Sequence, residues 1–334
     1  MAVRAALSGG WGWLGDAPPV AQLILRRTAL GIVTLFVVSL VVFFATEILP
    51  GNAAYAILGH AATPASLRTL EDQLHLNRGL FEQYWLWLTG LLTGNPGHSL
   101  VNGESVWSLV EPRLLNSAVL VVVAGAIGVV IGLAVGTVAA LRRDGWFDHL
   151  TSAWSLGVTA LPEFVVAIAL TIVFSTLLFR ILPATSALPL GTYAWTQPRL
   201  LILPVLTLVI VIVPYIHRMM RAAMIEALES DYVEMARLNG VPPWRLAVLH
   251  AAPNAIAPTI QVIGLTFLYL AGGIVVVEVV FEFPGIGQGL VNAVSDRDVP
   301  VIQFIVLLLA AFYVFVNIMT DIIALAASPR RHPR

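Results

Sequence analysis

The chain has 334 residues, of which 58% are hydrophobic and only 11% are charged, and its mean hydropathy is +0.88. Soluble globular proteins carry roughly 25% charged residues, so this composition excludes a soluble body of this size. The 18 basic residues, all of them Arg, nearly balance 19 acidic ones, so no basic excess indicates nucleic acid as a partner. The absence of Cys excludes disulfides, thiolate metal sites and cysteine nucleophiles. The sequence therefore predicts a polytopic membrane protein.

Six segments are apolar and long enough to cross a membrane, which takes about 20 mostly apolar residues. The expected spans are 28–49, 116–141, 153–179, 200–217, 256–281 and 301–327. The first has features of a secretory signal, because Arg26 and Arg27 precede it and Ala54-Tyr55-Ala56 resembles a cleavage site. Its apolar run exceeds the roughly 7–15 residues of a signal core, however, and five more spans follow. We therefore expect an uncleaved anchor.

The positions of the Arg residues predict the orientation of the chain. Twelve of the 18 lie in four segments: 1–27, 142–152, 218–255 and 328–334. By the positive-inside rule these segments face the cytoplasm, which puts both termini there. The chain is thus expected to have a cytoplasmic N-terminal segment (1–27), a transmembrane domain (28–327) and a short cytoplasmic tail (328–334). The segments 50–115, 180–199 and 282–300 then face outside.

The long outer loop 50–115 has a helical pattern of its own. Between residues 66 and 92, apolar side chains recur at three- and four-residue spacing and include a cluster of aromatic residues. Aromatic side chains favour the headgroup region of a membrane. We expect a helical hairpin that lies on the outer leaflet. A lid that gates a ligand is the alternative, and the sequence leaves it open.

The cytoplasmic loop 218–255 has more pattern than a simple turn needs. Met219–Leu238 is predicted as one helix with an acidic side, and Gly240 is expected to end it. A second, short helix is expected over Pro243–His250. Two helices joined at a glycine form a compact knob, which is typical either of an ordinary surface hairpin or of a docking site for another protein.

The spacing within this loop carries a family resemblance. Glu234-Met235-Ala236, Gly240 and Pro253 are spaced like the Glu-Ala-Ala loop of bacterial ATP-binding-cassette (ABC) importer permeases, with three residues between Ala236 and Gly240. Three further residues at four-residue intervals resemble the peptide-importer branch: His250, Asn254 and Pro258. The loop departs from the pattern at Met235 and in the sequence His250-Ala251-Ala252 before Pro253.

Other segments resemble the same branch over nearly the whole chain. In chain order they are Arg26-Arg27, Leu49-Pro50-Gly51-Asn52, residues 74–100, Phe283-Pro284-Gly285-Ile286-Gly287, residues 296–303, Asp321 and Ser328-Pro329-Arg330. One departure is Gly94-Asn95-Pro96-Gly97, where relatives carry Gly-Asp-Leu-Gly. Together these segments resemble the first of two membrane subunits of a dipeptide or oligopeptide importer, the oligopeptide-B or dipeptide-B type.

The resemblance implies an all-α fold of the type I ABC importer permease, in a bacterial plasma membrane. It implies three kinds of partner: a second homologous permease subunit, two ATP-binding subunits or domains, and an extracytoplasmic solute-binding protein. Contact with the ATPase would involve the following residues: Glu234, Ala236, Gly240, His250 and Pro253. ATP and Mg²⁺ would bind the partner ATPase, which leaves this chain without a cofactor or a catalytic residue. Dipeptides, longer peptides, glutathione and nickel chelates all remain open as substrates.

The residues agree that this chain does not hydrolyse nucleotides. It has no G-x-x-x-x-G-K-[ST] sequence and no Lys at all, so it lacks the lysine of a phosphate-binding loop. Three His residues, His149, His217 and His250, are too scattered to predict a metal site. Paired nucleophile and base residues at membrane depth are also lacking, which argues against an intramembrane hydrolase.

A charge within a span is costly and marks a functional candidate, and we single out three of the acidic residues in the expected spans. Glu163, which follows Pro162 at mid-membrane, is either a group facing a cavity or the proton-coupling carboxylate of a secondary transporter. Glu278, with Glu282 nearby, is a candidate contact for the amino group of a peptide or for the binding protein. Asp321 is expected to be structural, paired with Arg330 or with a neighbouring helix.

Two further patterns bear on these alternatives. Four glycines at three- and four-residue spacing predict a face of the second span that another helix approaches closely: Gly125, Gly128, Gly132 and Gly136. Secondary carriers commonly consist of two related halves, and we find no repeat between 28–179 and 200–327. The sequence therefore favours an ATP-driven permease over a proton-coupled carrier that uses Glu163.

Overall fold

The computed structural model describes residues 19–48, 63, 78–189 and 192–327, and these form helices without any β-strand. Five unbroken helices in this part of the chain are long and apolar enough to cross a membrane. They are α2 (Pro19–Ile48), α6 (Val106–Leu141), α9 (Pro198–Leu228), α12 (Ala252–Val280) and α14 (Val299–Ala327). Five of the six predicted spans are thereby confirmed. The Ala54-Tyr55-Ala56 sequence lies outside the described residues.

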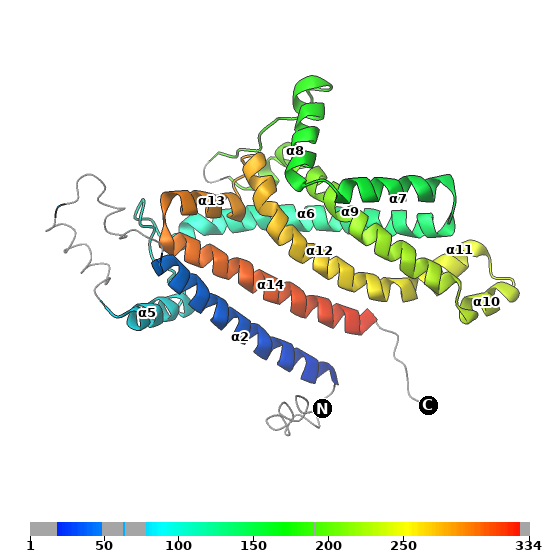
Figure 1. Cartoon of the computed structure of the whole chain (residues 1–334), viewed down its shortest axis with the longest axis horizontal. Coiled ribbons are helices and arrows are strands. Elements are labelled where there is room, and N and C mark those ends of the chain that lie inside the picture. The colour runs from blue at the N-terminus through cyan, green and yellow to red at the C-terminus, as the bar shows by residue number, and fades with distance from the viewer. Residues whose placement is uncertain (1–18, 49–62, 64–77, 190–191, 328–334) are drawn as a thin grey trace.

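The third predicted span, 153–179, is not one straight helix. It is divided into α7 (Trp146–Thr159) and α8 (Glu163–Thr171), which continues as the π-helical turn η3 (Ile172–Leu177), and the two parts meet at 106°. Pro162 causes the break, because it has no N–H to donate and disfavours helical geometry in the residue before it. Its own backbone is extended, with ψ at 149°. Consequently α7 runs along the bundle, whereas α8 projects away from it (Figure 1).

Helix α9 forms the centre of the fold. In its most apolar stretch 72% of the residues are buried, against 17–33% in the other four long helices. It packs against α6, α7, α8 and α12. The predicted glycine face of α6 makes part of this contact: a Cβ added to Gly128 would lie 2.4 Å from Ile212, and one added to Gly136 would lie 2.7 Å from the carbonyl oxygen of His217. The close approach expected from the glycine spacing is confirmed.

Helices α2 and α14 pack side by side at the edge of the bundle (Figure 1). Their cytoplasmic ends are joined by an ion pair between Arg27 Nε and Asp321 Oδ2, 2.6 Å apart. The neighbouring-helix partner expected for Asp321 is therefore confirmed, while Arg330 lies outside the described residues. The ends of α2 and α14 nearest the termini lie at the same end of the bundle, as the Arg distribution predicts.

The outer end contains more helix than the sequence indicated. Of the predicted helix 66–92, the described part is α5 (Leu80–Leu92), whose buried Tyr84 hydroxyl lies 2.8 Å from Ser39 Oγ of α2. Two helices were not predicted: η4 (Ala194–Thr196) and the 11-residue α13 (Ile286–Asp296). Helix α6 begins at Val106, before the expected start of the second span, and so brings Arg113 into a long helix.

Candidate functional site

The cytoplasmic loop folds into a hairpin of short helices between α9 and α12, here called the cytoplasmic hairpin (residues 229–251). It contains α10 (Asp231–Leu238), α11 (Pro243–Arg245) and the π-helical turn η5 (Leu246–Ala251), which runs directly into α12. The prediction of one helix over Met219–Leu238 is wrong, because the chain leaves the helix at Ser230 (φ −77°, ψ 150°). The Ser230 hydroxyl bonds back to the carbonyl of Ala227, an alternative to continued helix that serine side chains often take.

Gly240 ends α10, as the sequence predicts. Its φ is +78°, in the left-handed region where a side chain is strained. This geometry lets the N–H of Gly240 donate to the carbonyl of Arg237 at 3.0 Å, and that of Val241 donate to Ala236 at 3.2 Å. The glycine therefore turns the chain within two residues and lets Pro242 start the next helix.

The inner side of the hairpin is firmly attached to the two long helices. Val233 is fully buried, and a cluster of small and flexible side chains joins η5 to α9 and α12: Met220, Ala223, Met224, Ala227, Ala247, Ala251 and Ala255. Polar contacts close the rim, since Asn254 donates to the Tyr232 hydroxyl at 2.7 Å and that hydroxyl donates to the carbonyl of His250 at 3.3 Å. A displacement of the hairpin would thus be passed directly to α9 and α12.

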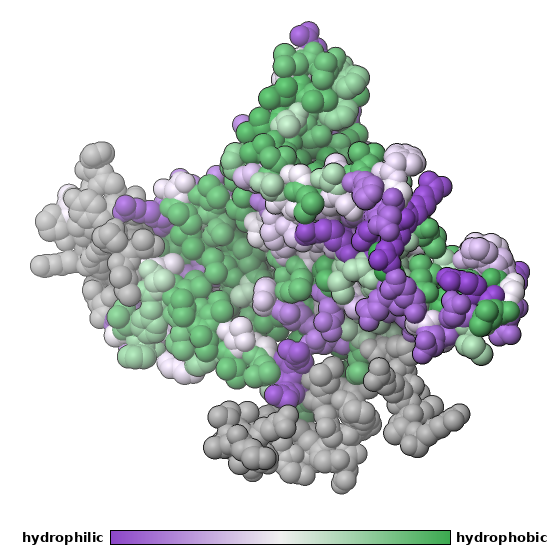
Figure 2. Space-filling view, turned by 45° about the vertical axis from the view of Figure 1, so that its right-hand side comes forward, coloured by the Kyte–Doolittle hydropathy of each residue, from purple (hydrophilic) through white to green (hydrophobic). Residues whose placement is uncertain are grey.

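The side of the hairpin that faces away from the bundle exposes apolar groups. The exposed side chains are Met235 (60%), Leu238 (73%), Trp244 (60%), Val248 (55%) and Leu249 (60%). In Figure 2 the end of the molecule that carries α10 and α11 shows hydrophobic atoms among hydrophilic ones. Clustered apolar exposure rimmed by polar residues is typical of a protein interaction surface.

All five residues predicted for ATPase contact lie on or beside this surface. Glu234 is exposed on α10 and pairs with Arg237 at 3.1 Å, and Ala236 is half-buried on the same helix. His250 is half-buried at the end of η5, and Pro253 is exposed at the start of α12. The structure thus brings them together, and their role in coupling stays a prediction.

Glu278 lies at the outer end of α12 and is completely buried. Its carboxylate accepts hydrogen bonds from Ser117 Oγ at 2.5 Å and from the backbone N–H groups of Gly287 at 2.7 Å and Gln288 at 3.2 Å. The N–H of Ile286 in turn donates to Ser117 Oγ at 2.8 Å. This carboxylate therefore joins α6, α12 and the N-terminus of α13, where the helix dipole favours negative charge. Contact with a peptide would require the cluster to open.

Glu163 has very different surroundings. It is the first residue of α8, at the break in the third span, and it is only half-buried between α9 and α12. The described residues offer it no ion pair. Among them, Tyr269 of α12 interacts with its carboxylate. Tyr269 was not singled out from the sequence, because a tyrosine in an apolar span gives no signal of its own.

A second polar connection missed by the sequence joins α7 to α9 on the cytoplasmic side. Arg221 binds Asp148 through two nitrogens, at 2.5 and 2.6 Å, and Asp148 is almost fully buried. Farther along α7, Ser155 Oγ lies 2.9 Å from His217 Nδ1. These bonds hold the half-span α7 against α9. Among the described residues no group of His, Asp and Glu is arranged to hold a metal ion.

Apolar helices packed around one central span, with an exposed hairpin fixed to two of them, define a polytopic membrane protein. Residues 128–333 match the family model of the binding-protein-dependent transport system inner membrane component, and residues 20–120 match the model of its N-terminal region. The chain belongs to this family. It is a multi-pass protein of a bacterial membrane, and the family acts in transport together with ATPase and substrate-binding partners.

Individual relatives are similar to this chain over nearly its full length. A probable peptide ABC transporter permease of Sinorhizobium fredii is 33% identical over 92% of this chain and 98% of its own. A putative peptide transport permease of Brucella suis is 34% identical over 94% and 99%, and the glutathione transport permease of Escherichia coli is 32% identical over 92% and 97%.

A solved structure supports the fold. The inward-facing MetNI methionine ABC transporter superposes with a TM-score of 0.54 at 18% identity, covering 66% of this chain and 97% of the MetNI chain. The sequence resemblance predicted the fold of an ABC importer permease, and this fold is confirmed. Nothing in these relationships supports the alternative of a proton-coupled carrier.

Proposed function

We propose that this chain is one of two permease subunits of an ATP-driven importer for dipeptides or oligopeptides. The observation that carries the proposal is the cytoplasmic hairpin, which combines an exposed apolar outer side with an inner side packed on α9 and α12. The peptide and glutathione permeases among its relatives support a peptide substrate.

Coupling in such a machine requires a membrane channel with two states and a partner that binds them differently. The hairpin would supply the partner contact through Glu234, Ala236 and Gly240, with His250 and Pro253 at its junction with α12. Because the hairpin is packed on the central helix α9, a change in the ATPase would shift the helices that surround the path.

The remaining partners follow from the same proposal. Two ATP-binding subunits bind ATP together with Mg²⁺ and hydrolyse the ATP. This chain contributes no catalytic residue. A solute-binding protein delivers the peptide from outside. The projecting arm (residues 163–179) supports a second permease subunit, because it carries large exposed apolar side chains such as Leu177 and Phe179 and appears almost uniformly hydrophobic at the top of Figure 2.

The test is purification of the complex from native membranes with Gly240→Val in place. The left-handed backbone of Gly240 strains any β-branched residue, so the turn between α10 and α11 should distort. We expect the ATPase subunit to be lost from the complex, or its activity to become independent of peptide and binding protein.

Gly103→Val is the matched control. Gly103 also has a left-handed backbone (φ +74°) and open space around it, but it lies in the outer loop. It should retain the ATPase. If both variants keep a coupled ATPase, or if the wild-type chain purifies without one, the proposal is wrong.

A further inference from the structure

The break in the third span leaves a carboxylate in an unusual position. Glu163 stands at the N-terminus of α8, half-buried, without an ion pair among the described residues. The helix dipole of α8 stabilises the negative charge in part. A carboxylate at membrane depth nevertheless remains costly unless it faces water or a cation. The position therefore suits contact with water or with a positively charged occupant.

The groups around Glu163 suit a cation. Tyr269 interacts with both Glu163 and Tyr215, and the centroids of the two tyrosine rings lie 5.7 Å apart. Arg218 lies over the Tyr215 ring, with its Cζ 5.7 Å from the ring centroid, so that ring face is already occupied. A Cβ added to Gly273 would lie 2.7 Å from Glu163 Oε1, so this glycine makes room for the carboxylate. A carboxylate beside tyrosine hydroxyls is a combination that binds ammonium groups, by charge attraction and by hydrogen bonds to the oxygen atoms.

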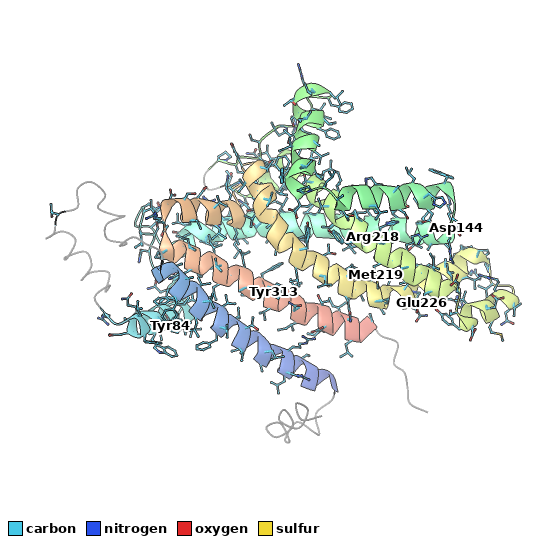
Figure 3. All side chains as sticks on the ribbon, in the orientation of Figure 1. Tyr84, Asp144, Arg218, Met219, Glu226 and Tyr313 are labelled. Carbon is cyan, nitrogen blue, oxygen red and sulfur yellow. The ribbon has the colours of Figure 1, made fainter. Side chains whose placement is uncertain are left out.

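The surface that carries these residues includes polar groups as well as apolar ones. Tyr269 is 44% exposed. Gly272 lies on the same side of α12, and a Cβ added to it would have no atom within 4 Å. Polar groups continue along the cytoplasmic half of α9, where Arg218 and Glu226 are exposed (Figure 3). Charged side chains in a row along exposed spans are tolerated beside a water-filled path. The row runs from the break in the third span towards the cytoplasmic hairpin.

We infer that Glu163, Tyr215 and Tyr269 form a subsite within the membrane for the positively charged amino group of the transported peptide. This inference rests on the proposed function. The subsite binds the ammonium through the Glu163 carboxylate and the tyrosine hydroxyls. It selects among peptides after the binding protein has released them.

The natural absence of Cys allows a direct test by thiol labelling of the assembled complex. Leu265→Cys places a thiol one helical turn from Tyr269, at a position that is 63% exposed. Two permanently charged reagents of similar size are compared: 2-(trimethylammonium)ethyl and 2-sulfonatoethyl methanethiosulfonate. We expect the positive reagent to react about tenfold faster, because the negative charge of Glu163 attracts it and repels the other reagent. A tenfold ratio corresponds to a difference of about 1.4 kcal/mol between the two reagents.

The preference should disappear when Glu163→Gln is added to Leu265→Cys. Trialanine should slow the labelling, whereas N-acetyl-trialanine, which has no ammonium group, should not. Val130→Cys is the control: it is 68% exposed on α6, on the side turned away from α9, and its labelling should not respond to Glu163→Gln. If Leu265→Cys fails to assemble, Tyr269→Cys takes its place with the same expected charge preference.

Three outcomes overturn the inference: equal labelling by the two reagents, equal protection by both peptides, or loss of the second permease subunit in Glu163→Gln. The last would mean that Glu163 pairs with a basic group of that subunit. Peptide import by the wild-type complex into vesicles separates a failure of the proposed function from a failure of the subsite. If the wild-type complex imports no peptide, the proposed function fails; if it imports peptide but labelling shows no charge preference, only the subsite fails.

Discussion

Two glutamates in the spans show how differently one residue type is used. Glu278 is fully buried and accepts three hydrogen bonds from α6 and α13. Glu163 is half-buried at a helix break and interacts with Tyr269. The first therefore acts as a structural joint, since its carboxylate is hydrogen-bonded to three groups of the protein. The second retains capacity for a ligand.

The largest effect should come from Glu278→Ala. The change leaves the Ser117 hydroxyl and two backbone N–H groups without their acceptor in a buried site, which costs roughly 3–5 kcal/mol of unfolding free energy. Thermal unfolding of the solubilised complex should show a clearly lower midpoint. Glu282→Ala, four residues away and exposed, is the control and should leave the midpoint unchanged. Equal midpoints for the two variants would refute the structural role.

The glycines that face the two carboxylates give an intermediate effect. A Cβ at Gly285 would lie 2.0 Å from Glu278 Oε1, which cannot move aside, so Gly285→Ala should cost about 1–3 kcal/mol. At Gly273 the carboxylate of Glu163 has room to turn away, and Ala gains about 0.5–1 kcal/mol as a helix former. Gly273→Ala should therefore be close to neutral in the same thermal measurement.

Gly157→Ala is the control for helix propensity, because Gly157 lies in α7 with open space around it. If Gly273→Ala destabilises as strongly as Gly285→Ala, then Glu163 is held as tightly as Glu278, and the distinction between the two carboxylates fails.

The smallest effect on stability should come from Glu163→Gln. The amide keeps the shape of the side chain and its contact with Tyr269, so the free energy of unfolding should change by less than about 0.5 kcal/mol. Its effect on import of peptides with a free amino group should be much larger. A large fall in the thermal midpoint of this variant would indicate a structural role like that of Glu278.

Much of the architecture could be predicted because it depends on local properties of the chain. Length and apolarity identify the spans, and a glycine such as Gly240 marks a helix end through its own backbone freedom. The spacing of Glu234, Ala236 and Gly240 likewise identified the cytoplasmic hairpin. The third span was predicted as straight although Pro162 was visible, because hydropathy measures how apolar a segment is and carries no information on its direction.

The surroundings of Glu163 and Glu278 differ because of contacts between residues that are far apart in the sequence. Ser117 meets Glu278 across 161 positions, and Asp321 meets Arg27 from the other end of the chain. Composition, spacing and family motifs determined the class of protein and predicted its orientation and its docking loop, because each depends on residues close together in the chain. The burial of each carboxylate was decided by the packing of α6, α9, α12 and α13, because a charge is satisfied by whatever groups the folded chain brings beside it.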